Sequence, residues 1–123
     1  MHIAVIGAGA IGCLVAGVLK KNGEEVTLVG RGSVVQAIKE KGLSISGVRG
    51  NFLVHLSISE NLNYIHDLVI LATKTQDIDS ALEGKANLMH NSLILTTQNG
   101  VQADNLVAKY VPRERIISSI VMF

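Results

Sequence analysis

The chain has 123 residues, which is the size of a single domain with a buried core. Apolar residues make up 48% and charged residues 17%, so the composition excludes a disordered chain. The net charge is +1 without a basic run, which argues against nucleic-acid binding. No apolar stretch reaches the ~18 residues of a membrane span, and no basic segment precedes an apolar one at the N-terminus. We therefore expect no membrane association and a cytoplasmic location.

The first predicted element is an apolar strand, residues 3–6, that ends in a glycine-rich turn. A helix is predicted directly afterwards, over residues 10–22, and G-x-G-x-x-G between a strand and a helix is a dinucleotide-binding fingerprint. We expect Gly7 to form the turn, Gly9 to admit a pyrophosphate, and Gly12 to allow close helix packing. The alternative is a tight turn without a ligand. The predicted cofactor contacts in the turn are Gly7, Ala8, Gly9, Ala10, Ile11 and Gly12.

A second apolar strand at 26–29 completes a strand–helix–strand unit. Ser33 is then the predicted N-cap of a helix that stops at Gly42, with Gln36 completing a capping box. Apolar residues alternate with polar ones from Leu43 to Ile58, which predicts a hairpin with one solvated face near a sheet edge.

The remaining elements continue the alternation of strands and helices. They are strands at 68–72 and 92–96, helices at 77–88 and 102–110, and a last apolar run at 116–123. Gly84 weakens the first of these helices. The order predicts a Rossmann-like, doubly wound α/β fold, a mostly parallel sheet with helices on both faces.

The residue that follows the second strand discriminates between the two nicotinamide dinucleotides. NAD enzymes usually place a carboxylate there for the ribose hydroxyls, yet residues 27–38 contain none and Arg31 takes the position. A guanidinium can form paired hydrogen bonds with a 2′-phosphate, so the sequence favours NADP(H) over NAD(H). A solvated loop arginine is the alternative.

Polar residues also follow the later strands, at the edge where ligands of such sheets bind. Lys74, with Gln76 close behind, follows the strand at 68–72 and could reach a phosphate or ribose, although a lysine at a strand end is more often simply solvated. Asn99 follows the strand at 92–96, where an amide could bind a substrate carbonyl or hydroxyl, although Asn-Gly is equally a turn sequence. The four histidines have no metal-ligand spacing, so no metal site is expected. Cys13 is expected to be a packing residue.

These segments together resemble the ketopantoate reductase (2-dehydropantoate 2-reductase) family along the whole chain. The segments are Gly7 to Gly12, Arg31, Ala72-Thr-Lys-Thr-Gln76 and Gln98-Asn-Gly-Val101. The resemblance implies reduction of 2-dehydropantoate to pantoate by NADPH, in pantothenate biosynthesis. It also implies that the glycine turn holds the pyrophosphate, Arg31 the 2′-phosphate and Lys74 the cofactor, with Asn99 beside nicotinamide and substrate.

In that family the proton donor is a lysine of a second, helical domain, so no catalytic residue is expected in this chain. The last apolar run has no polar ending. We therefore expect residues 1–123 to be an NADP-binding domain truncated before the helical substrate domain, rather than a complete small domain. Such a chain alone would bind NADP(H) without turnover.

The sequence is also compatible with other functions. A regulatory Rossmann domain that senses a nucleotide is one alternative, but such domains usually keep a carboxylate where this chain has Arg31. A reductase of another 2-keto acid is a second, and an interaction module with a degenerate site is a third, which the intact glycines disfavour. The sequence leaves the oligomeric state open, with a homodimer as one arrangement.

Overall fold

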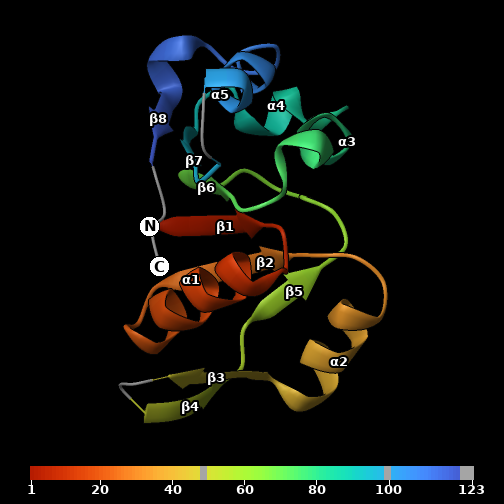
Figure 1. Cartoon of the computed structure of the whole chain (residues 1–123), viewed down its shortest axis with the longest axis vertical. Helices are drawn as coiled ribbons and strands as arrows, with labels where there is room; N and C mark the ends of the chain where they lie inside the picture. Colours follow the sequence, from red (N-terminus) through yellow and green to blue (C-terminus); the bar gives the residue numbers. More distant parts are fainter. Residues whose placement is uncertain (48–49, 99–100, 120–123) are drawn as a thin grey trace.

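The computed structural model describes residues 1–47, 50–98 and 101–119, and within them six strands form one parallel sheet (Figure 1). In spatial order the strands are β5 (Ser57–Ser59), β2 (Glu25–Val29), β1 (His2–Ile6), β6 (Leu68–Leu71), β7 (Leu93–Thr96) and β8 (Ile116–Ser118). The chain first builds outward from β1 to β5 and then restarts on the other side of β1 at β6. This is the strand order 3-2-1-4-5-6 of doubly wound nucleotide-binding folds, and it confirms the predicted fold class.

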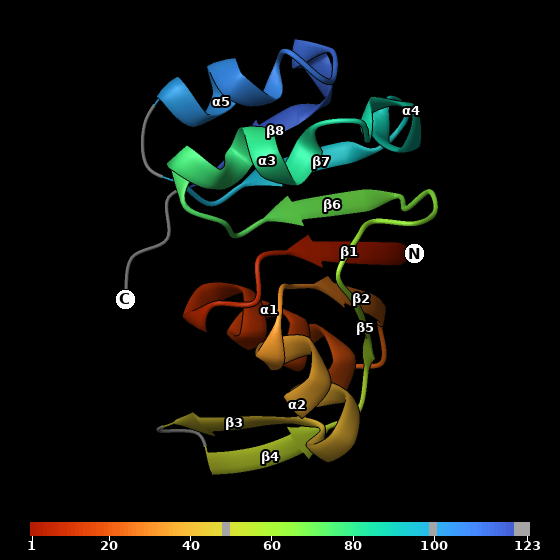
Figure 2. The ribbon, with the colours of Figure 1, turned by 90° about the vertical axis from the view of Figure 1, so that its right-hand side faces the viewer.

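Helices cover both faces of the sheet, and each face has its own apolar core. The helices are α1 (Ala10–Lys21), α2 (Ser33–Lys41), α3 (Ile78–Leu82), α4 (Ala86–Met89) and α5 (Val101–Val107), with short 3-10 turns η1 (Thr75–Asp77) and η2 (Arg113–Arg115). Figure 2 shows α3, α4 and α5 at the end of the molecule that contains β7 and β8, with α1 and α2 at the other. Consecutive residues of β1, such as Ala4 and Val5, are fully buried in opposite cores. This two-sided burial explains why β1 is continuously apolar from Ile3 to Ile6.

Helix α2 begins differently from the prediction. The N-cap is Gly32 and no side chain caps the helix, so Ser33 is already the first helical residue. The N–H of Val35 donates to the carbonyl of Gly32 at 3.2 Å, and Gln36 donates to Glu40 at 2.9 Å along the exposed face. The predicted capping box is therefore wrong, because Gln36 forms an i, i+4 pair instead of reaching back to the helix start.

The helix predicted over residues 77–88 is two short helices, α3 and α4. Gly84 lies between them with φ +77°, a left-handed conformation that a helix cannot contain and that glycine adopts without strain. Helix α5 ends at Val107 rather than at Tyr110. Tyr110 N–H donates to the carbonyl of Val107, so the chain tightens into a turn before Pro112.

The segment from Leu43 to Ile58, in which apolar and polar residues alternate, contributes strands to two different sheets. Strands β3 (Leu43–Gly47) and β4 (Gly50–Val54) form the predicted antiparallel hairpin as a separate two-stranded sheet. Its continuation is β5, which pairs in parallel with β2 at the edge of the main sheet. The sequence did not predict this third strand of the unit, because an edge strand and a hairpin strand share the same alternation of apolar and polar residues.

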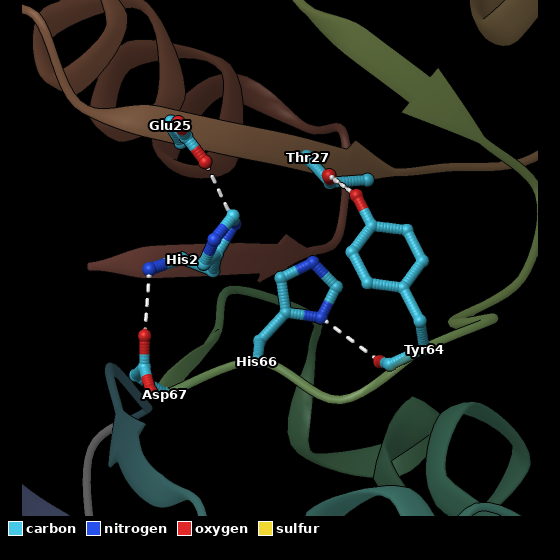
Figure 3. A network of polar contacts seen from close by, with 6 residues as sticks. All are labelled: His2, Glu25, Thr27, Tyr64, His66 and Asp67. Carbon is cyan, nitrogen blue, oxygen red and sulfur yellow. Dashed lines mark hydrogen bonds and ion pairs between the residues drawn. The ribbon is translucent and has the colours of Figure 1, made fainter.

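The amino-terminal edge of the sheet is held by a polar network (Figure 3). His2 pairs with Glu25 at 2.8 Å, and its backbone N–H donates to Asp67 at 2.8 Å. His66 is only 2% exposed and donates from Nδ1 to the carbonyl of Tyr64 at 3.0 Å, while the two rings stack with centroids 4.3 Å apart. The network ties β1, β2 and the start of β6 together, on the edge opposite the glycine turn.

Candidate functional site

The glycine turn passes over the carboxyl end of β1 in very close contact with β6. Gly7 has φ +113°, and its N–H donates to the carbonyl of Val29 at 2.8 Å. A Cβ at this position would lie 2.8 Å from the backbone of Ala72 and of Thr73. Only glycine combines this positive φ with so near an approach, so residue 7 fixes how tightly the turn lies on the sheet.

Gly12 and Gly9 have opposite surroundings. A Cβ on Gly12 would lie 1.7 Å from the carbonyl oxygen of Gly7, so a side chain there is sterically excluded. A Cβ on Gly9 would meet no atom within 4 Å among the described residues. The missing side chain of Gly9 therefore leaves open space at the start of α1, where the first N–H groups of a 12-residue helix are free to bind an anion.

A cavity of about 360 Å³ begins at this turn and extends along the carboxyl ends of the strands. Its walls come from the turn, the ends of β2, β5 and β6, and helix α3. The lining residues are Ile6, Gly7, Ala8, Gly9, Val29, Gly30, Arg31, Glu60, Asn61, Leu62, Ala72, Thr73, Lys74, Asp77, Ser80, Ala81 and Lys85. The cavity thus lies where the strand order reverses, which is where ligands of open α/β sheets bind.

Charged side chains of both signs line the cavity. The basic ones are Arg31, Lys74 and Lys85, and the acidic ones are Glu60 and Asp77. Arg31 Nη2 lies 3.9 Å from an oxygen of Asp77, and the backbone N–H of Gly32 donates to Glu60 at 3.2 Å. The loop after β2 is therefore held between two carboxylates.

A second, more open hollow continues from Lys74 toward the end of β7. Ile11, Gln76, Thr97 and Gln98 line it together with residues 72–75. Gln98 donates from its side-chain amide to the carbonyl of Thr73 at 2.6 Å, which joins the ends of β7 and β6. Its Oε1 is buried and has no hydrogen-bond partner in the part of the chain that the structure describes. Gln98 lines the second hollow, whereas Arg31 lines only the first cavity.

Most of the predicted cofactor contacts lie on these two hollows. Gly7, Ala8, Gly9, Arg31 and Lys74 line the cavity, whereas Ile11, Gln76 and again Lys74 line the second hollow. Ala10 and Gly12 line neither of them, because Ala10 starts helix α1 and Gly12 packs against Gly7. Asn99 lies outside the described residues.

Sequence reasoning missed several lining residues. Glu60 and Asn61 follow β5, the strand that was not predicted, and Ser80 and Lys85 come from α3 and the connection after it. The usable signal was position, because polar residues directly after any strand of a parallel sheet reach the same edge. Once β5 is placed in the main sheet, Glu60 is expected at the site.

Cys13 contributes packing to the turn rather than reactivity. Its thiol donates to the carbonyl of Ala8 at 3.3 Å, and burial raises the pKa of the Cys13 thiol above its ordinary value. The thiol therefore stays protonated at neutral pH despite its place in the first turn of α1.

The two hollows and the glycine turn lie next to one another along the carboxyl edge of the sheet. The open space over Gly9 lies beside the amides at the start of α1, the cavity includes Gly9 in its lining, and the second hollow is lined by Ile11 of the same helix. Among the described residues, no group of three His, Cys, Asp or Glu side chains lies close enough to bind a metal ion. Nor does the described part of the chain contain a helix both long and apolar enough to cross a membrane.

The strand order, the glycine turn and the cavity at the reversal point define a Rossmann-type nucleotide-binding domain. A sequence model of the family "Ketopantoate reductase PanE/ApbA" matches residues 3–123. The chain therefore belongs to the ketopantoate reductase family, as its motifs predicted.

Individual relatives agree with this assignment. The chain is 39% identical over 102 residues to the 2-dehydropantoate 2-reductase of Pyrococcus horikoshii, and 34% identical over 122 residues to that of Lactococcus lactis. These matches cover 82% and 94% of this chain but 34% and 39% of the relatives. The chain thus spans little more than a third of the length of these relatives.

Solved structures show the same fold. A PanE/ApbA family ketopantoate reductase from Ralstonia eutropha superposes with a TM-score of 0.86 at 32% identity, over 100% of this chain and 42% of that one. A D-mandelate dehydrogenase in complex with NADH and anilino(oxo)acetate gives a TM-score of 0.91 at 31% identity, over 100% and 41%. Structures of this fold therefore include one with a bound nicotinamide dinucleotide.

Proposed function

We propose that this chain is the NADP(H)-binding part of a reductase that converts 2-dehydropantoate to pantoate. The observation that supports it best is the open space over Gly9 at the head of a cavity that Arg31 flanks. The family and the names of the relatives from Pyrococcus horikoshii and Lactococcus lactis support the substrate.

Different residues along the carboxyl edge of the sheet bind different parts of the cofactor. The amides of the turn and of α1 bind the pyrophosphate, and Arg31 binds the 2′-phosphate by paired charged hydrogen bonds. Lys74 lines both hollows and contacts the cofactor between its two halves, with Gln76 beside it. Asn99 binds nicotinamide and substrate. The bound nicotinamide supplies the hydride that reduces the keto carbon, and the protein orients it.

The proton for the reduced oxygen comes, in this proposal, from a helical domain that is absent from this chain. The proposed domain organisation is thus an NADP-binding domain over residues 1–123, to which a substrate domain is added in the whole protein. The chain alone binds cofactor without reducing substrate. A cytoplasmic location and a homodimer stay predictions.

A reductase of another 2-keto acid that uses NADH is the second candidate. It is favoured by the likeness to D-mandelate dehydrogenase with NADH and anilino(oxo)acetate, and by the two carboxylates, Glu60 and Asp77, beside Arg31. Carboxylates at this end of the site can accept hydrogen bonds from an unphosphorylated ribose. Whether the site prefers NADPH or NADH depends on whether Arg31 binds a 2′-phosphate.

Charge reversal at Arg31 tests the proposal. Arg31→Glu should weaken NADPH binding by roughly 10- to 100-fold and NADH binding only slightly, because only NADPH has the 2′-phosphate. The control is Lys39→Glu, which makes the same charge change at an exposed position of α2 outside the cavity lining. Equal losses for both cofactors in Arg31→Glu, measured by equilibrium titration, would contradict the proposal.

A further inference from the structure

Arg31 and Asp77 form an ion pair that spans the crevice of the site. Arg31 follows β2 and Asp77 belongs to η1, which follows β6, and these two strands flank β1 on opposite sides. The guanidinium and the carboxylate are 3.9 Å apart, and both side chains line the cavity. The pair therefore crosses the point where the strand order reverses, at the place proposed for the 2′-phosphate of the cofactor.

The loop that bears Arg31 is fixed independently of this pair. The backbone N–H of Gly32 donates to Glu60, at the end of β5. Gly30 packs so closely that a Cβ there would lie 2.6 Å from the Cβ of Ala8 in the glycine turn. The backbone on both sides of Arg31 is thus held in place, and its side chain lies within reach of Asp77.

We propose that Asp77 is a specificity-determining residue of this site, because it competes with the 2′-phosphate for the Arg31 guanidinium. This inference rests on the proposed function. NADPH binding exchanges the carboxylate of Asp77 for the phosphate as the partner of Arg31, whereas NADH binding leaves the ion pair in place. Asp77 therefore lowers the preference of the site for NADPH over NADH.

The expected change in NADPH affinity on loss of Asp77 depends on how exposed the side chains of Arg31 and Asp77 are. The Arg31 side chain is 78% and the Asp77 side chain 34% exposed, so water and salt screen the pair. Exposed pairs of this kind contribute little, and we expect the loss of Asp77 to tighten NADPH binding by about two- to fivefold. The gain should shrink as salt is added, because screening weakens the competition.

The test is Asp77→Asn, titrated with NADPH and with NADH in the full chain. Asparagine keeps the shape and the ability to begin a helix, so α3 should be preserved, which thermal unfolding checks. The expected result is tighter NADPH binding and unchanged NADH binding. Glu83→Gln, an exposed residue outside the cavity lining, removes the same charge and should leave both affinities unchanged.

A second background separates competition from simple repulsion. In Arg31→Ala the gain from Asp77→Asn should be much smaller, because no guanidinium is left for which to compete. An equal gain in both backgrounds would assign the effect to repulsion between Asp77 and the phosphate and overturn the inference. If Asp77→Asn binds NADPH with the affinity of the wild type, the inference about Asp77 is overturned but the proposed function is not. If the wild-type chain shows no saturable dinucleotide binding, both the inference and the proposed function are overturned.

Discussion

Gly9 and Gly12 lie three residues apart in the glycine motif, Gly9 as the N-cap of α1 and Gly12 inside the helix. Their positions in the motif predict different roles, space for a pyrophosphate at Gly9 and close helix packing at Gly12. The space around the two residues differs in the same way. A Cβ added to Gly9 meets nothing within 4 Å, whereas a Cβ added to Gly12 meets a carbonyl oxygen at 1.7 Å. Gly12 is therefore required for packing, whereas the open space at Gly9 is available for the proposed ligand. This difference is testable because alanine at each position should change a different property.

Gly9→Ala should fold like the wild type but lose cofactor. The backbone of Gly9 is extended, with φ −82°, so alanine fits, and the loss of glycine at an N-cap costs less than about 1 kcal/mol. The new methyl group occupies the space proposed for the pyrophosphate, so NADPH binding should weaken at least about tenfold. Thermal unfolding and equilibrium titration measure the two quantities, and unchanged NADPH affinity would contradict this assignment.

Gly12→Ala is the matched comparison. Its methyl group requires the turn to separate from α1, which should lower the free energy of unfolding by about 3 kcal/mol or more. Denaturant unfolding should show this loss in the absence of any dinucleotide. A Gly12→Ala chain as stable as Gly9→Ala would mean that the contact between α1 and Gly7 relaxes easily.

The residues at the site were only partly predictable from the sequence. Gly7, Gly9, Arg31 and Lys74 were found because motif spacing and position after a strand are local properties. The acidic partners of the Arg31 loop were not, because they come from strand ends that are distant in sequence. Contacts of this kind need the strand order before they can be inferred.

At the scale of elements, the buried strands were the most predictable and the edge the least. Strands β1, β2, β6 and β7 are mostly apolar and were placed within one residue at each end. Strand β5 was missed because it has one exposed face, and α3 and α4 were merged because their apolar spacing continues across Gly84. In both cases tertiary pairing or backbone conformation, rather than periodicity, decided the outcome.

The amino-terminal edge of the sheet should make stability depend on pH through His66. The ring is buried, and its Nε2 has no hydrogen-bond partner among the described residues. Burial is the main cause that lowers the pKa of His66 below its ordinary 6.5; the Tyr64 carbonyl and Asp67 oppose the shift, and His2 adds to it. The unfolded chain therefore takes up the proton first, so stability is complete above about pH 6.5 and is lost as the pH falls below it.

The free energy of unfolding should thus decrease from about pH 7.5 to about pH 5.5 more steeply in the wild type than in His66→Gln. The slope contributed by one such group cannot exceed about 1.4 kcal/mol per pH unit. Urea unfolding at several pH values measures it. Identical pH dependence in the two proteins would mean that His66 protonates equally in the folded and unfolded chains.

At the scale of the whole molecule, the reversal of strand order between β1 and β6 creates the site. From β1 the chain extends the sheet to one side, through β2 and β5, and then to the other, through β6, β7 and β8. The loops that follow β1 and β6 therefore run to opposite sides, and the glycine turn, Arg31 and Lys74 line the cavity at that point. The fold class was predictable because alternating strands and helices admit few topologies. The detailed charge balance of the cavity was not, since it depends on which strand ends become neighbours.

In the proposed function, this edge of the sheet binds a phosphorylated nicotinamide dinucleotide. The most direct measurement is an equilibrium titration of the wild-type chain with NADPH and, under the same conditions, with NADH. We expect saturable NADPH binding at micromolar concentrations and clearly weaker NADH binding. Tighter binding of NADH than of NADPH, or no saturable binding of either, would contradict it.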